Sequence, residues 1–162
     1  MSNATPEGYV VAVLGATGLV GRTMISVLEE RNFPVRQLLP LASSSGGRTV
    51  RFRGADIPVQ QVQPDSFAGV DIAIFSAGGA ASLTYAPEAA ARGCVVVDNS
   101  SAWRMDPNVP LVVSQVNPGA LTTHNGIVAN PNCSTMQLAP LLKALSDAAG
   151  LERVVVATYQ AV

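Results

Sequence analysis

The fold is decided by one stretch near the start of the chain, Val10-Val11-Ala12-Val13-Leu14-Gly15-Ala16-Thr17-Gly18-Leu19-Val20-Gly21. Its first five residues are apolar and predict a buried β-strand. Three glycines follow at the spacing G-x-x-G-x-x-G. Residues 19–31 then carry apolar side chains at helical spacing. The stretch therefore predicts a strand, a glycine loop and a helix in direct succession.

The glycine loop has the arrangement of a dinucleotide-binding site. Gly15 allows a tight turn off the strand, Gly18 leaves no Cβ between backbone and pyrophosphate, and Gly21 lets the helix lie close to the sheet. The start of the helix then offers N–H groups and a positive dipole end to the phosphates. A purely structural turn is the alternative, but the position between strand and helix favours nucleotide binding.

Strand-like and helical runs continue to alternate along the chain. Strand-like runs lie at residues 35–41, 49–62, 71–76, 95–98, 111–114, 126–129 and 153–159, and helical runs at residues 80–92 and 132–149. This alternation predicts an α/β fold with a Rossmann-like, doubly wound and mainly parallel sheet. The run from residue 153 reaches the end of the sequence, so we expect either a terminal strand or the front part of something longer.

Composition narrows the class of protein. Hydrophobic residues make up 48% and charged residues 13%, which favours a folded core over disorder. Ten basic and eleven acidic residues give a net charge of -1, so we expect no nucleic-acid partner. The apolar runs are of strand length and no secretory signal is visible, so we expect no membrane span and a cytoplasmic location. The two cysteines make no disulfide framework, and we predict no metal site.

The end of the second predicted strand indicates which dinucleotide binds. No acidic residue stands between Arg31 and Gly54, whereas NAD sites usually carry one there for the ribose. Three serines and a guanidinium offer donors for a 2′-phosphate instead, which favours NADP(H); a solvated Ser/Gly loop is the alternative. Small residues after the run at 71–76 also allow a cofactor to approach; a plain tight turn is the alternative, and taken alone these residues favour it. The predicted cofactor contacts are Gly15, Thr17, Gly18, Leu19, Val20, Ser43, Ser44, Ser45, Arg48, Ala77 and Gly78.

A cysteine stands where a helix is predicted to begin. Asn132 is a natural N-cap, which places Cys133 in the first turn, where N–H groups and the helix dipole favour a thiolate. Beside a nicotinamide, a thiolate can attack an aldehyde, and the hemithioacetal that forms yields hydride to NADP⁺ and becomes a thioester. A small buried cysteine is the alternative. We expect Cys94 in the core and His124 in a surface turn.

Five short sequence motifs, taken in their order along the chain, resemble those of a known family. They are Gly15-Ala16-Thr17-Gly18-Leu19-Val20-Gly21, Phe75-Ser76-Ala77-Gly78, Asp98-Asn99-Ser100-Ser101-Ala102-Trp103-Arg104, Pro131-Asn132-Cys133-Ser134-Thr135 and Thr158-Tyr159-Gln160-Ala161-Val162. Together they resemble aspartate-β-semialdehyde dehydrogenase over essentially the whole chain. The last three motifs are much more specific than the glycine loop.

The resemblance implies a reaction and three residue roles. The family reduces L-4-aspartyl phosphate with NADPH to aspartate semialdehyde and phosphate, on the way to lysine, diaminopimelate, methionine, threonine and isoleucine. Cys133 matches its nucleophile, Arg104 an arginine that binds the phosphate, and Gln160 a glutamine that orients the substrate. The family also implies a homodimer. Residues 1–130 then form the NADP-binding domain, and residues 131–162 begin a truncated catalytic and dimerisation domain.

Two departures from the family pattern matter. The family often has a basic residue in its 2′-phosphate loop, but here the loop reads Ala42-Ser43-Ser44-Ser45, so Ser44 or Arg48 is expected to substitute. The family's second domain brings the general acid/base histidine, which this sequence lacks, so we expect this chain alone to be inactive. The rival enzyme is N-acetyl-γ-glutamyl-phosphate reductase. The alternative that is not an enzyme is a non-catalytic NADP-binding module.

Overall fold

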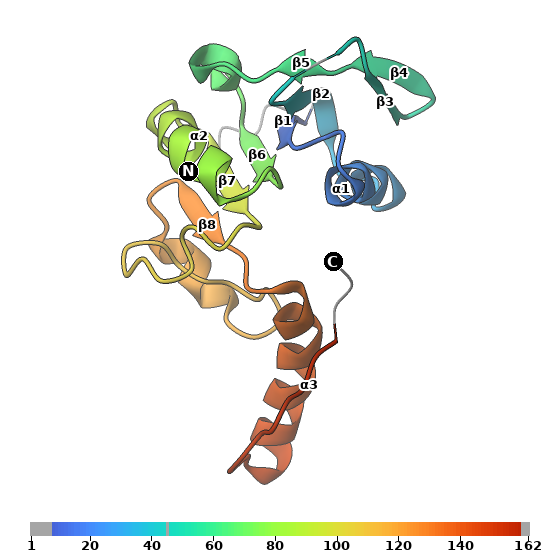
Figure 1. Ribbon diagram of the computed structural model, residues 1–162. Helices are drawn as coiled ribbons and strands as arrows, with labels where there is room; N and C mark the ends of the chain where they lie inside the picture. Colours follow the sequence, from blue (N-terminus) through green and yellow to red (C-terminus); the bar gives the residue numbers. More distant parts are fainter. Residues whose placement is uncertain (1–7, 45, 160–162) are drawn as a thin grey trace.

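The structure is a computed structural model that describes residues 8–44 and 46–159. Strands and helices alternate along the chain (Figure 1). The elements are β1 (Tyr9–Leu14), α1 (Leu19–Glu30), β2 (Val35–Ala42), β3 (Thr49–Phe52), β4 (Ala55–Pro58), β5 (Gln60–Gln61), the 3-10 helix η1 (Pro64–Phe67), β6 (Ile72–Phe75), α2 (Gly79–Ala91), β7 (Val95–Asp98), the 3-10 helix η2 (Pro118–Thr123), β8 (Ile127–Ala129) and α3 (Cys133–Ala149). The predicted strand, glycine loop and helix are confirmed at β1 and α1.

Most of the strands form one parallel sheet in the order β5-β2-β1-β6-β7-β8. β1 lies inside it, where Leu14 pairs with Leu41 of β2 and with Phe75 of β6. β3 and β4 form a separate antiparallel pair. A mainly parallel sheet with intervening helices confirms the predicted fold class.

The two faces of the sheet carry different helices. Leu14 belongs to the hydrophobic cluster that contains Ala86 of α2, whereas Val13 belongs to the cluster that contains Ile25 of α1. Because neighbouring residues of a strand point to opposite faces, α1 and α2 cover opposite faces. Figure 1 shows the two helices on either side of β1 and β6. The sheet is therefore doubly wound, as predicted.

The direction in which the chain adds strands reverses beside β1. β2 and β5 lie on one side of it, and β6, β7 and β8 follow on the other. In open parallel sheets, ligands bind outside the carboxyl ends of the strands at such a reversal. The loops after β1 and β6 meet there, since a Cβ added to Gly15 would lie 2.4 Å from Ser76 O. The fold thus places the glycine loop at the crevice where a ligand is expected.

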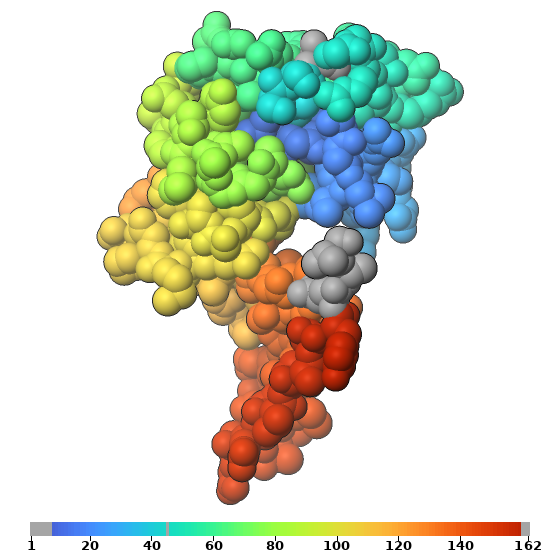
Figure 2. All heavy atoms as spheres, in the orientation of Figure 1, coloured from blue at the N-terminus to red at the C-terminus, as the bar shows by residue number. Residues whose placement is uncertain are grey.

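α3 stands apart from the sheet. None of its residues is buried, and Figures 1 and 2 show it extending away from the rest of the molecule. The predicted division of the chain at residue 130 stays a prediction. Within the described ranges, no helix is both long and apolar enough to cross a membrane.

The strand predicted at residues 153–159 is not formed. Val154, Val155 and Val156 are 42%, 80% and 53% exposed, and no strand is assigned there. β-propensity expresses how a side chain fits a pleated, half-buried surface rather than a preference of the backbone itself. The prediction was wrong because none of the described strands pairs with this run.

The strand predicted at residues 111–114 is reduced to a single bridge between Leu111 and Ala129. Val113 N–H donates to Asn117 Oδ1 at 2.8 Å, and Asn117 N–H donates back to Val113 O at 3.0 Å. This local turn uses the backbone groups that a strand would need for its ladder.

Candidate active site

The glycine loop is held against the end of β2. The N–H groups of Gly15 and Ala16 both donate to Leu41 O, at 2.9 and 3.1 Å, and Gly18 N–H donates to Gly15 O at 3.0 Å. Gly18 is the N-cap of α1, and no side chain caps this end. The first turn of a helix has N–H groups without intrahelical partners, so this end can bind an anion.

The glycines of the loop serve different purposes. Gly15 has φ +92°, and a Cβ added to Gly21 would lie 2.2 Å from Gly15 O, so loop and helix need glycine at both positions. Gly18 has φ −75°, and its added Cβ would meet only Gly15 O, at 3.4 Å. Neither the backbone conformation nor the contacts among residues 8–44 and 46–159 require glycine at position 18. A pyrophosphate lying close to the backbone would require it.

The end of β2 carries the groups predicted to contact a 2′-phosphate. Ser43, Ser44 and Arg48 are all exposed. Arg48 Nη2 donates to Ser44 O at 2.6 Å and to Ser44 Oγ at 3.3 Å. A guanidinium and a hydroxyl therefore lie together where dinucleotide sites bind the ribose. Ser45, the remaining predicted contact, lies outside the described residues.

The other predicted cofactor contacts lie on the surface near the same edge. Leu19 and Val20 are 84% and 52% exposed, and Thr17 is partly exposed. Ala77 and Gly78 are exposed after β6, and Gly78 is the N-cap of α2, again with no side-chain cap. The reversal of strand order therefore brings two uncapped helix N-termini to one edge of the sheet.

Cys133 is the first residue of α3. Asn132 is the N-cap: its Oδ1 accepts from Ser134 N–H at 3.0 Å and lies 3.9 Å from Cys133 Sγ. The predicted helix start and N-cap are thereby confirmed. The thiol is exposed, as a nucleophile that meets a substrate must be. β8 leads into this turn, so Cys133 follows the same carboxyl edge that carries the glycine loop.

Arg104 lies half-buried beside the ends of β7 and β8. Its Nε donates to Asn130 O at 2.8 Å and its Nη2 to Asn99 O at 3.0 Å. Its phosphate-binding role stays a prediction. Gln160, the other predicted substrate residue, lies outside the described residues.

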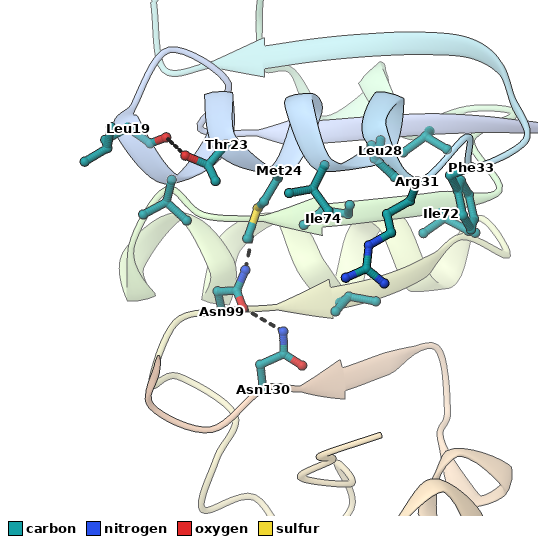
Figure 3. Close-up of a pocket in the computed structure, with 14 residues that line it drawn as sticks. Leu19, Thr23, Met24, Leu28, Arg31, Phe33, Ile72, Ile74, Asn99 and Asn130 are labelled. Atoms are coloured by element: carbon teal, nitrogen blue, oxygen red, sulfur yellow. Dashed lines mark hydrogen bonds between the residues drawn. The ribbon is translucent and has the colours of Figure 1, made fainter. Parts of the chain in front are cut away.

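Asn99 and Asn130 meet at this site, although neither was predicted from the sequence to have a role. Asn130 Nδ2 donates to Asn99 Oδ1 at 2.6 Å, and Asn99 Nδ2 lies 3.7 Å from Met24 Sδ (Figure 3). The sequence does place one polar residue directly after β7 and one directly after β8. Their contact depends on β7 and β8 being neighbours in the sheet, which the sequence does not state.

Cys94 and His124 lie outside this arrangement. Cys94 is 1% exposed, and burial, with a smaller contribution from the Asp71 carboxylate, raises the pKa of its thiol from 9.0 to about 12. His124 Nδ1 accepts from Gly126 N–H at 3.0 Å, within a turn. The core position of Cys94 and the turn position of His124 are as predicted. In the described part of the chain, no cluster of His, Cys, Asp and Glu is arranged to hold a metal ion.

A long apolar groove of about 820 Å³ runs beside α1 (Figure 3). Apolar side chains of α1 and of strands β1, β6 and β7 form most of its walls, among them Val20, Val27, Val11, Ile72, Ile74 and Val97. Asn99, Asn130 and Arg31 also line it. Parallel sheets normally have both faces covered, so this face lacks part of its cover in the described residues.

Known proteins resemble this chain in sequence. Residues 10–124 match the family described as semialdehyde dehydrogenase, NAD binding domain. The chain is 56% identical over 159 residues to aspartate-semialdehyde dehydrogenase of Aquifex aeolicus (strain VF5), a match that covers 96% of this chain and 47% of that protein. The chain thus spans about half the length of the curated relatives it matches.

Solved structures resemble it as well. Aspartate semialdehyde dehydrogenase II from Vibrio cholerae, complexed with ASA, has a TM-score of 0.84 and 50% identity, covering 90% of this chain and 48% of that one. Aspartate semialdehyde dehydrogenase with NADP from Candida albicans has a TM-score of 0.71 and 28% identity, covering 88% of this chain and 48% of that one.

Proposed function

The chain belongs to the semialdehyde dehydrogenase family through its NAD-binding domain, and from this membership we propose that it supplies the cofactor site and the nucleophile of an NADP-dependent aspartate-semialdehyde dehydrogenase. The proposed reaction converts L-4-aspartyl phosphate to L-aspartate 4-semialdehyde and phosphate, toward lysine, diaminopimelate, methionine, threonine and isoleucine. One observation carries the proposal: an uncapped helix start at the glycine loop and an exposed Cys133 at another helix start follow the same edge of the sheet.

The residues at this edge fit a dinucleotide. Gly18 is the strongest indication, because neither its backbone angles nor any contact among the described residues requires a glycine there. The first turn of α1 offers N–H groups to the pyrophosphate. Arg48 and Ser44 offer a guanidinium and a hydroxyl to a 2′-phosphate, which supports NADP(H) over NAD(H). The relative from Candida albicans, whose structure is described as containing NADP, supports the same choice.

Cys133 carries the covalent step in this proposal. Its thiolate attacks the acyl carbon of aspartyl phosphate, a C–S bond forms, the C–O bond to phosphate breaks, and phosphate leaves with the electron pair. N–H groups at the start of α3 are suited to stabilise the oxyanion of the tetrahedral intermediate. Arg104 lies near this turn, and its guanidinium is suited to hold the leaving phosphate. Bound NADPH supplies the hydride that reduces the thioester to the aldehyde and releases the cysteine.

The experiment measures turnover of a protein of the relatives' full length that contains this chain. Aspartate semialdehyde, phosphate and NADP⁺ should give NADPH, and Cys133→Ser should lower kcat by at least about a thousandfold while leaving the Kd for NADPH within about twofold. The control is Cys94→Ser, since Cys94 lies in the core. Turnover retained in the Cys133 variant would remove the nucleophile from the proposal.

Assays of the same protein also distinguish the proposed function from its two alternatives. N-acetylglutamate semialdehyde, offered in place of aspartate semialdehyde, should give little NADPH. A preference for it would indicate the acetylglutamyl-phosphate enzyme. NADPH binding without turnover of either aldehyde would indicate a non-catalytic module.

A further inference from the structure

Asn130 is bonded through both its main chain and its side chain, although it lies in a loop. Its N–H donates to Asp98 O at 2.8 Å, its O accepts from Arg104 Nε at 2.8 Å, and its Nδ2 donates to Asn99 Oδ1 at 2.6 Å. Figure 3 shows the two asparagine side chains meeting at the ends of neighbouring strands. Asn130 is therefore fixed against rotation.

The segment that supplies these partners is itself braced. Asp98 is fully buried and its Oδ2 accepts from Ser100 Oγ at 2.6 Å, while the same Oγ accepts from Ala102 N–H at 3.1 Å. Arg104 also donates to Asn99 O, at 3.0 Å. The turn after β7 thus presents Asn99 Oδ1 as a fixed acceptor.

Asn130 lies close to Cys133 along the chain. Only Pro131 and Asn132 separate the two residues. Proline has a restricted φ and holds the residue before it extended, so this link is stiff. α3 receives little support from packing, because none of its residues is buried. Rotation of Asn130 would therefore move the first turn of α3 together with the thiol.

We propose that Asn130 is a positioning residue for Cys133: its side-chain amide, bonded to Asn99 Oδ1, fixes the turn that aims the thiol. This inference rests on the proposed function, in which Cys133 is the nucleophile. Asn99 Nδ2 also lies 3.7 Å from Met24 Sδ of α1, the helix that follows the glycine loop. Asn99 and Asn130 together therefore connect α1 to the turn that bears Cys133. Asn130 acts through Cys133 and not on the substrate.

The test compares three variants of the full-length protein. Asn130→Ala removes the donor. Asn99→Asp keeps an acceptor of the same shape, so the bond from Asn130 survives. Asn125→Ala makes the same change as the first variant at an exposed asparagine, which makes no side-chain hydrogen bond to the rest of the described chain. For each variant, kcat, KM, the Kd for NADPH and the rate of Cys133 alkylation by iodoacetamide are measured.

Asn130→Ala should lower kcat at least about tenfold, because a misplaced nucleophile loses its near-attack geometry. KM and the Kd for NADPH should stay within about twofold, and the alkylation rate of Cys133 should change. Asn99→Asp keeps the acceptor for Asn130 but loses the donor to Met24, so it should lower kcat less than Asn130→Ala does. Asn125→Ala should match the unchanged protein. A purely structural role would lower thermal stability without this separation of kcat from KM.

Normal kcat and normal alkylation in the Asn130→Ala protein would overturn the inference, as would an equal loss of kcat in Asn99→Asp. If Asn130→Ala does not fold, Asn99→Asp is compared with Asn99→Asp combined with Asn130→Asp. Two facing carboxylates then lack a donor, and kcat should fall at least about tenfold below that of the single variant; equal kcat overturns the inference. Turnover retained by Cys133→Ser would instead remove Cys133 as the nucleophile of the proposed function, and the alkylation rates alone would then decide whether Asn130 positions the thiol.

Discussion

Arg104 uses two of its guanidinium nitrogens to hold main-chain carbonyls of Asn99 and Asn130. In the described part of the chain, its Nη1 has no hydrogen-bond partner and remains available to a ligand. The planar guanidinium of an arginine can donate to carbonyls on one side and to an anion on the other, whereas the compact ammonium of a lysine cannot. Arg104 is therefore suited both to shape the turn and to serve the phosphate-binding role that we propose for it.

Arg104→Lys should impair the use of phosphate far more than cofactor binding. A lysine cannot reach both carbonyls and still present a donor to phosphate, so the KM for phosphate should rise at least about tenfold while the Kd for NADPH stays within about twofold. Steady-state kinetics of the full-length protein checks this. Arg92→Lys, at the exposed end of α2, is the control. An unchanged KM for phosphate would show that Arg104 serves the turn alone.

Ser44→Asp should erode a preference for NADPH over NADH. The side chain lies against Arg48, so a carboxylate there would neutralise the guanidinium and repel a 2′-phosphate. The ratio of kcat/KM for NADPH to that for NADH should fall at least about tenfold, which corresponds to about 1.4 kcal/mol. Ser146→Asp, exposed in α3, should leave the ratio unchanged. No initial preference for NADPH would contradict the NADP proposal itself.

The two cysteines should differ in alkylation. Cys133 is exposed, whereas Cys94 is buried and the pKa of its thiol is raised to about 12. Only thiolate reacts, so iodoacetamide at pH 7 to 9 should label Cys133 and leave Cys94 unmodified in the folded protein. Peptide mass spectrometry reports the order of labelling, and Cys94 should react once the protein is unfolded. Preferential labelling of Cys94 in the folded protein would contradict the assignment of Cys133 as nucleophile.

At the scale of elements, the apolar run, the glycine spacing and the helical spacing of apolar residues predicted a strand, a loop and a helix in residues 10–31, and all three are formed. The prediction succeeded because the positive φ of Gly15 and the close approach of Gly21 to Gly15 O are both set within the loop itself, so the glycine spacing expresses them directly. The strand predicted at residues 153–159 failed because a strand needs a partner, which local sequence does not supply. For the same reason the contact between Asn99 and Asn130 could not be predicted, since it depends on which strands are neighbours.

Alanine substitution should separate the roles of two glycines in the loop. Gly21→Ala places a Cβ 2.2 Å from Gly15 O and should lower the free energy of unfolding by about 1–3 kcal/mol. Gly18→Ala should change it by less than about 1 kcal/mol, because φ −75° suits alanine. It should nevertheless raise the Kd for NADPH at least about tenfold. Urea unfolding and cofactor titration measure the two effects. Normal NADPH affinity in the Gly18 variant would remove the main support for the cofactor site.

At the scale of the whole molecule, the sheet is covered unequally. α2 and its cluster cover one face, whereas the groove of about 820 Å³ leaves part of the other face open beside α1. The chain spans about half the length of its relatives, so a protein of their length would have ample further chain to cover this face. Parallel sheets are covered on both faces in known folds. We therefore expect an apolar segment from the additional region to fill the groove in the full-length protein.

A charge placed in the groove tests this expectation. Val27 and Leu83 are 41% and 56% exposed on α1 and α2, and only Val27 lines the groove. In the full-length protein, Val27→Asp should lower the free energy of unfolding by at least about 2 kcal/mol, because a covering segment would bury the carboxylate without a partner. Leu83→Asp, the matched change outside the groove, should cost less than about 1 kcal/mol. Equal and small effects in urea unfolding would mean that the groove stays open to solvent in the full-length protein.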